Sequence, residues 1–131
     1  MNGLYTVEIE DFAERHFIKK FRKKYKQNWE LTEDAIRAMY ERVDSLLEKK
    51  RANIICDVDG VRIIKSEFSI VGTNISPKSS GNRCIAACIV TEKTVKILLV
   101  YSKNDLSEHK ETSAWKNLIT ENYPEYSSLF T

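Results

Sequence analysis

The chain has 131 residues, 42% of them apolar and 31% charged, which is typical of a globular domain and excludes a disordered or collagen-like chain. It has no run of 18 apolar residues and no basic and apolar leader at its start, so we expect neither a membrane partner nor secretion, but one cytoplasmic domain over residues 1–131. The formal net charge of +2 by itself selects no partner.

The first part of the chain predicts a short strand followed by two helices. Residues 5–10 alternate between apolar and polar, which is typical of a strand. Aromatic residues recur every four or five positions over 12–26 and predict a helix with an aromatic stripe. After a loop at 26–30, a second apolar stripe predicts a helix from its N-cap Thr32 to about Lys50. These two helices form a helical hairpin.

The rest of the chain predicts three strands and a final helix. Residues 61–71, 84–90 and 95–101 are strand-like, and a polar loop at 72–82 separates the first two. A C-terminal helix is expected over about 107–123. This order predicts an α+β fold, with an N-terminal strand and a helical hairpin packed on a small, largely antiparallel sheet and an added C-terminal helix.

The cysteines and histidines form no recognisable metal or catalytic motif. Cys56, Cys84 and Cys88 lie in apolar segments without zinc-ligand spacing, so we expect reduced core residues. His16 and His109 fall in different elements and lack triad spacing. Walker A, GxGxxG, GxSxG and HExxH motifs are absent, and we expect neither a cofactor nor a metal.

Basic residues are concentrated in the first predicted helix. Residues 14–26 contain seven basic residues and one acid, whereas residues 104–131 contain five acids and two lysines. The basic end suits a polyanion, and the alternative is a solvated helix face. The predicted contacts to such a polyanion are Arg15, Lys19, Lys20, Arg22 and Lys23, together with His109 just past the last strand.

A second group of basic residues lies on and between the predicted strands. Lys65 is on the polar face of its strand, Lys78 is in the following loop, Arg83 opens the next strand, and Tyr101 and Lys103 close the last one. If the strands are neighbours, these side chains meet on the side of the sheet opposite the hairpin. Cleavage of RNA without a metal needs a base, an acid and cations in one place. The alternative is a set of separate, solvated lysines.

Several segments resemble the RelE/ParE toxin superfamily, in particular the RelE-like toxins of bacterial toxin–antitoxin modules. These segments are 64–73 (IKSEFSIVGT), 78–83 (KSSGNR), 95–105 (VKILLVYSKND) and 111–116 (ETSAWK), and with the preceding hairpin the resemblance covers about residues 12–120. The resemblance implies an enzyme, an mRNA endonuclease that cuts in the ribosomal A site without a metal. It also implies a cognate antitoxin, the ribosome and mRNA as partners.

The resemblance further implies catalytic residues. Lys65 and Lys78 match the basic residues that precede the family's central arginine, and Arg83 matches that arginine. Tyr101 and Lys103 fall on the last strand, which here ends in YSKND and not in an arginine followed by a tyrosine. We expect Lys65 or Lys78 to be the base, Arg83 to clamp the phosphate, and Tyr101 with Lys103 to act as acid or to position substrate.

Two other functions stay open on the same scaffold. One is a ParE-like toxin that inhibits DNA gyrase without cleaving RNA, and the other is an inactive RNA-binding member. Convergence of Lys65, Lys78 and Arg83 on one surface favours the nuclease, because fold alone does not separate these functions. Trp29 and Trp115 are expected to be core residues and not base-stacking ones. The added helix could cover the sheet, bind a partner or extend the core.

Overall fold

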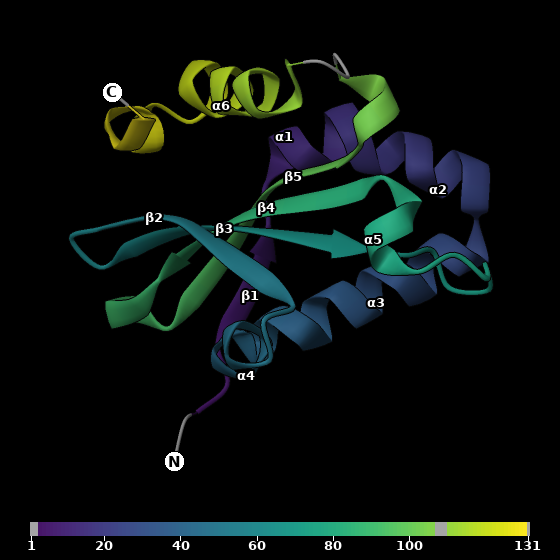
Figure 1. Cartoon of the computed structure of the whole chain (residues 1–131), viewed down its shortest axis with the longest axis horizontal. Helices are drawn as coiled ribbons and strands as arrows, with labels where there is room; N and C mark the ends of the chain where they lie inside the picture. The colour runs from purple at the N-terminus through teal and green to yellow at the C-terminus, as the bar shows by residue number, and fades with distance from the viewer. Residues whose placement is uncertain (1–2, 107–109, 131) are drawn as a thin grey trace.

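The structure, a computed structural model, describes residues 3–106 and 110–130 (Figure 1). Its elements are β1 (Thr6–Ile9), α1 (Asp11–Ala13), η1 (Glu14–Ile18), α2 (Lys19–Tyr25), α3 (Gln27–Glu41), α4 (Val43–Glu48), β2 (Ala52–Val58), β3 (Val61–Phe68), α5 (Pro77–Ser80), β4 (Asn82–Ile89), η2 (Val90–Glu92), β5 (Thr94–Ser102), η3 (Lys103–Asp105), α6 (Glu111–Asn122) and η5 (Pro124–Phe130). His109 and the expected start of the final helix at 107 lie outside the described residues. No helix in the described ranges is both long and apolar enough to span a bilayer.

The described residues form a five-stranded sheet in the order β1-β5-β4-β3-β2. β1 runs parallel to β5, and the other neighbouring strands are antiparallel. The predicted α+β class is therefore confirmed, including the N-terminal strand, the largely antiparallel sheet and the C-terminal helix.

Each face of the sheet has its own hydrophobic core, because successive strand residues point to opposite faces. On one face, Ile64 and Ile97 are buried with Tyr40 and other residues of α3 and α4. On the other face, Ile85 is buried with Trp115 of α6 and with residues of η5. Figure 1 shows the sheet between α3 and α4 on one side and α6 on the other. The added helix thus covers part of the face on which the catalytic residues are expected.

The predicted aromatic helix is present, but it contributes to both cores. It consists of α1, the π-helical segment η1 and α2. The five-residue spacing from Phe12 to Phe17 spans the π segment, and both rings pack in the core beneath α6. Phe21, farther along, is buried in the other core, where its ring stacks on Trp29 with the centroids 4.8 Å apart.

The loop predicted at 26–30 is wrong. The chain turns at the single residue Lys26, with φ 52° and ψ −120°, and α3 begins at Gln27. Trp29 is buried in the first turn of that helix. Thr32 lies inside the helix and is not its N-cap, and its hydroxyl accepts the backbone N–H of Val71 at 2.9 Å. Thr32 therefore joins α3 to the segment after β3.

The cysteines and tryptophans are core residues, as expected. Cys84 and Cys88 are buried, Cys56 is half-buried, and all three are free thiols. Burial raises the pKa of the Cys84 thiol to about 12. Trp29 and Trp115 are both buried.

Candidate functional site

The predicted strand residues lie on one face of the sheet, the face away from α3. Lys65 of β3 is opposite Ile85 of β4. One step along, Glu67 of β3 is opposite Arg83, and Arg83 is opposite Tyr101 of β5. Because alternate residues share a face, this register places Lys65, Arg83 and Tyr101 together.

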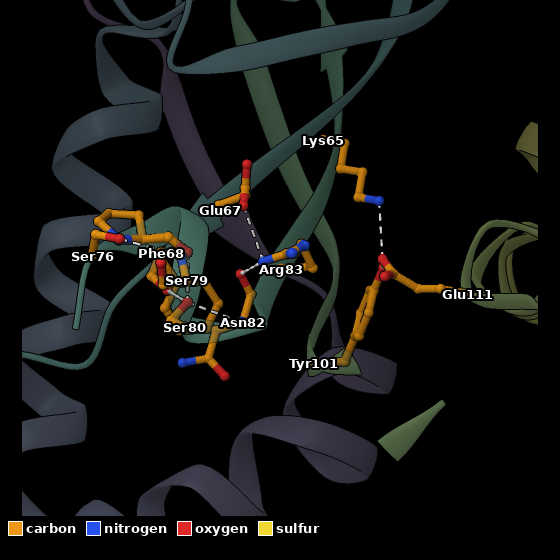
Figure 2. Close-up of polar contacts among 11 residues, drawn as sticks. Lys65, Glu67, Phe68, Ser76, Ser79, Ser80, Asn82, Arg83, Tyr101 and Glu111 are labelled. Atoms are coloured by element: carbon orange, nitrogen blue, oxygen red, sulfur yellow. Dashed lines mark hydrogen bonds and ion pairs between the residues drawn. The ribbon is translucent and has the colours of Figure 1, made fainter. Parts of the chain in front are cut away.

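Lys78 reaches the same region through the short helix α5. The N-cap Ser76 accepts the backbone N–H of Ser79 at 3.3 Å. The Ser80 hydroxyl donates to the Phe68 carbonyl at 2.6 Å and accepts the backbone N–H of Asn82 at 3.0 Å. These contacts fix α5 against the end of β3 and the start of β4 (Figure 2).

A pocket of about 380 Å³, which we call the cationic pocket, lies between β3, β4, α5, α6 and the connection from α4 to β2. Among the described residues, its lining includes five basic and two acidic side chains: Lys50, Arg51, Lys65, Lys78 and Arg83, with Glu67 and Glu111. Five positive charges against two negative ones leave an excess of three positive charges. The pocket therefore favours an anionic ligand.

Two sets of polar contacts organise the cationic pocket. Glu111, in the first turn of α6, accepts a hydrogen bond from the Lys65 ammonium at 2.9 Å and another from the Tyr101 hydroxyl at 2.7 Å. Arg83 pairs with Glu67 at 3.2 Å and donates to the Asn82 carbonyl at 3.1 Å. Figure 2 shows Glu111 reaching from α6 to Lys65 and Tyr101.

These contacts fix the protonation states of Glu111 and Tyr101. Burial disfavours the charged form of Glu111, but hydrogen bonds from Tyr101 and Lys65 outweigh it, so the pKa of Glu111 is below its usual value. Burial, and then the hydrogen bond to Glu111, raise the pKa of Tyr101 well above its usual value. At neutral pH, Glu111 is a carboxylate and Tyr101 is a neutral donor. The Tyr101 side chain is buried, so it acts on the pocket through Glu111.

The other predicted residues lie outside the cationic pocket. Lys103 is in η3, and its stem runs beside Gly81, where a Cβ would lie 3.3 Å from the lysine Cγ. Of the basic helix, Arg22 is paired with Glu14 and Glu33. Lys20 lines a second pocket of about 360 Å³, and the remaining predicted contacts, Arg15, Lys19 and Lys23, lie along η1 and α2.

Sequence reasoning missed Glu111, Glu67, Lys50 and Arg51. Glu67 carried a usable signal, because it shares a strand face with Lys65 at two residues' distance. Lys50 and Arg51 end a basic run that begins at Lys49, directly after α4. Glu111 gave no comparable signal, because its partner Lys65 is 46 positions away in the chain.

The cationic pocket has the groups needed to hold a phosphodiester. The forked guanidinium of Arg83 matches two phosphate oxygens, and the lysines add positive charge. The carboxylate of Glu111 can accept a proton. In the part of the chain that the structure describes, no cluster of three His, Cys, Asp or Glu side chains is arranged to hold a metal ion.

Comparison with known proteins identifies the fold. No family model matches the sequence, and no curated protein matches it either. A solved structure, the archaeal RelE–RelB complex from Pyrococcus horikoshii OT3, contains a similar chain with a TM-score of 0.53 and 14% sequence identity. The match covers 76% of this chain and 96% of that one. The protein therefore has a RelE-like fold, as the sequence resemblance predicts.

Proposed function

We propose that the protein is the toxin of a type II toxin–antitoxin module and cleaves mRNA on the ribosome in the cytoplasm, by a mechanism that needs no metal. The RelE-like fold supports the toxin class. The convergence of Lys65, Lys78 and Arg83 in one pocket, with Lys50 and Arg51 beside them, carries the nuclease assignment. This arrangement favours the nuclease over the gyrase poison, since a surface that only blocks gyrase needs no such set.

In this proposal Arg83 binds the scissile phosphate and stabilises the charge of the phosphorane. Its side chain is only 12% exposed, and Glu67 and the Asn82 carbonyl hold it in place. A cation held in position before the reaction needs little reorganisation in the transition state. Lys50 and Arg51 contribute further positive charge for the flanking phosphates.

The proton acceptor in this proposal is Glu111, because in the ion pair Lys65 is the proton donor. Glu111 takes the 2′-hydroxyl proton, and the 2′-oxygen attacks phosphorus to form a 2′,3′-cyclic phosphate. The bond from phosphorus to the 5′-oxygen breaks, and that oxygen takes a proton from the Lys78 ammonium. Tyr101 orients Glu111, and Lys103 positions the flanking RNA. If Lys78 is instead the base, as the sequence also allows, replacing Glu111 will not remove activity.

The partners follow from the same proposal. The basic helix docks on ribosomal RNA phosphates, where each contact weakens as salt increases. A cognate antitoxin covers the toxin, and the edge strand β2 offers the exposed apolar side chains Ile54, Ile55 and Val58. Copurification with the product of a neighbouring small reading frame tests this, and an Ile54→Asp substitution is expected to weaken the complex.

The experiment that tests the function adds the purified protein to a translating extract and maps mRNA ends by primer extension. The wild type is expected to cleave, and Arg83→Ala is expected to lower cleavage by about 100-fold or more. Arg62→Ala is the matched control, since it removes a surface ion pair with Asp57 outside the pocket. Its activity is expected to be unchanged.

The other functions give different results in this experiment. Intact mRNA together with linearised plasmid in a gyrase assay contradicts the nuclease and identifies a gyrase poison. Intact mRNA and unchanged gyrase activity, with ribosome binding retained, identify an inactive RNA-binding member.

A further inference from the structure

We infer that the second pocket, between α2 and the start of β4, binds the base of the nucleotide next to the cleaved phosphate. We call it the aromatic pocket. The inference rests on the proposed function only in taking RNA as the substrate; binding of a nucleotide at this pocket can be measured without any cleavage.

The walls of the aromatic pocket suit a flat aromatic ligand. Phe21 and Tyr25 of α2 line it, with ring centroids 6.3 Å apart and an interplanar angle of 23°. Ile70 and Ile75, from the segment after β3, add apolar surface. Its volume of about 360 Å³ falls within the range of small-molecule sites. Bases of single-stranded RNA are commonly held by stacking on such aromatic side chains.

Asn82 supplies the hydrogen-bonding group. It is only 8% exposed and lines the aromatic pocket. Its backbone N–H and carbonyl are both used, by Ser80 and Arg83, but its side-chain amide has no partner among the residues described. In Figure 2 this amide points away from Arg83 and Glu67. Its amide atoms are accessible to solvent, so a ligand in the pocket can contact them, and an amide both donates to and accepts from the edge of a base.

The charge at the aromatic pocket favours a ligand that carries phosphate. Lys20 and Lys24, one helical turn apart on α2, line it, against the single acid Asp105 among the described lining residues. The Lys24 ammonium lies 5.2 Å from the centroid of the Tyr25 ring. An aromatic floor, a free amide and two cations together match a nucleotide better than a neutral peptide.

The two pockets are adjacent along the chain. Asn82 and Arg83 are consecutive residues of β4, about 3.8 Å apart at Cα, and their side chains point to opposite faces. Similarly, Ser80 of α5 lines the aromatic pocket and Lys78 of α5 lines the cationic pocket. An RNA strand that crosses α5 can place its phosphate at Arg83 and the neighbouring base at Asn82.

The test records methyl NMR spectra of the full chain with labelled isoleucines while AMP, GMP, CMP or UMP is added. At least one nucleotide is expected to shift the methyl signals of Ile70 and Ile75 and to saturate, with Ile54 on the exposed edge strand unchanged. Ribose 5-phosphate is expected to leave Ile70 unchanged. Equal shifts from ribose 5-phosphate, or shifts from an acidic aromatic peptide but from no nucleotide, overturn the inference.

Variants locate the binding. Asn82→Ala and Lys20→Gln are expected to weaken nucleotide binding by about 10-fold. Lys116→Gln, a lysine of α6 that does not line the pocket, is expected to have no effect on nucleotide binding. Tyr25→Leu replaces a half-buried ring and serves as the second variant if Asn82→Ala does not fold. Unchanged binding by folded Asn82→Ala or Tyr25→Leu contradicts the inference.

The outcomes separate this inference from the proposed function. Nucleotide-dependent shifts in a protein that does not cleave mRNA support the binding site and remove the nuclease assignment. Arg83-dependent cleavage without any nucleotide-dependent shift keeps the nuclease and overturns the aromatic pocket. If both hold, Asn82→Ala is expected to alter which bases flank the cut, whereas Arg83→Ala lowers cleavage at every site.

Discussion

At Glu111, one carboxylate oxygen accepts hydrogen bonds from Lys65 and Tyr101, which lie 46 and 10 positions away in the chain. A base that is oriented by a second group is a recurring arrangement in catalytic sites. The neutral Tyr101 hydroxyl supplies the orientation, and Lys65 adds the charge that keeps the carboxylate ionised. The proton transfer we propose depends on this one side chain.

We therefore expect Glu111→Gln to lower the rate of mRNA cleavage by about 100-fold or more, since glutamine keeps the size but cannot accept the proton. Ribosome binding is expected to stay the same. Single-turnover cleavage and cosedimentation with ribosomes measure the two effects, with Asp57→Asn as the control from an ion pair outside the pocket. Full activity in Glu111→Gln, with activity lost in Lys78→Met, would move the base to Lys78.

The same carboxylate makes stability depend on pH. The pKa of Glu111 is lower in the folded protein than its usual 4.5. The ionised carboxylate therefore stabilises the folded state above about pH 4.5, and this stabilisation is lost as the pH falls through the folded-state pKa. At pH 7, Glu111→Gln is expected to lower the free energy of unfolding by about 1–3 kcal/mol. Urea unfolding at pH 7 and pH 3 measures the difference between the two proteins, which should shrink at pH 3. A constant difference contradicts the ion-paired state.

The corner between α2 and α3 consists of a single residue. Lys26 has φ 52° and ψ −120°, a conformation that glycine adopts readily and a lysine does not. Lys26→Gly is expected to raise the free energy of unfolding by about 1 kcal/mol. Lys23→Gly, inside α2, is expected to lower it by about the same amount. Thermal or urea unfolding of both variants checks the prediction, and a destabilised Lys26→Gly protein would contradict it.

The corner at Lys26 is also where the helix boundary predicted from the sequence is wrong. Strands β1, β3, β4 and β5, the aromatic helix and the final helix were predictable because their apolar periodicity matches the faces they bury. Strand β2 was not predicted, and its burial pattern shows no such periodicity. The start of α3 was not predictable from the sequence. Thr32 and the acids after it are typical of a helix start, but here they lie inside the helix. Burial of Trp29 against Phe21 extends α3 back to Gln27, and this is a tertiary contact.

The molecule as a whole has two cores, and the C-terminal segment completes one of them. Residues of α6 and η5 bury the sheet face that carries Ile63, Ile85 and Leu99. A chain ending at Leu106 exposes these side chains. Each of them adds about 1.5–3 kcal/mol to the free energy of unfolding when it is buried. We expect this truncation to lose cooperative unfolding and to bind a hydrophobic dye, whereas a chain ending at Ser127 still unfolds cooperatively. Cooperative unfolding of the shorter chain would show that the second core is dispensable.

The site was only partly predictable at this scale. Lys65 and Arg83 could be expected together because neighbouring strands bring alternate residues to one face, and Lys78 because it lies in the connection between those two strands. Glu111, the acid that pairs with Lys65, could not, since α6 and β3 meet only in the folded molecule. The buried position of Tyr101 likewise follows from the helix that covers the sheet.

The most direct test of the account is the chemistry of the ends that the protein leaves on mRNA in a translating extract. The account predicts 2′,3′-cyclic phosphates on the upstream fragments and 5′-hydroxyls on the downstream ones, both absent with Arg83→Ala and present with Arg62→Ala. Upstream fragments that end in 3′-hydroxyls, or mRNA that stays intact with the wild-type protein bound to ribosomes, would contradict it.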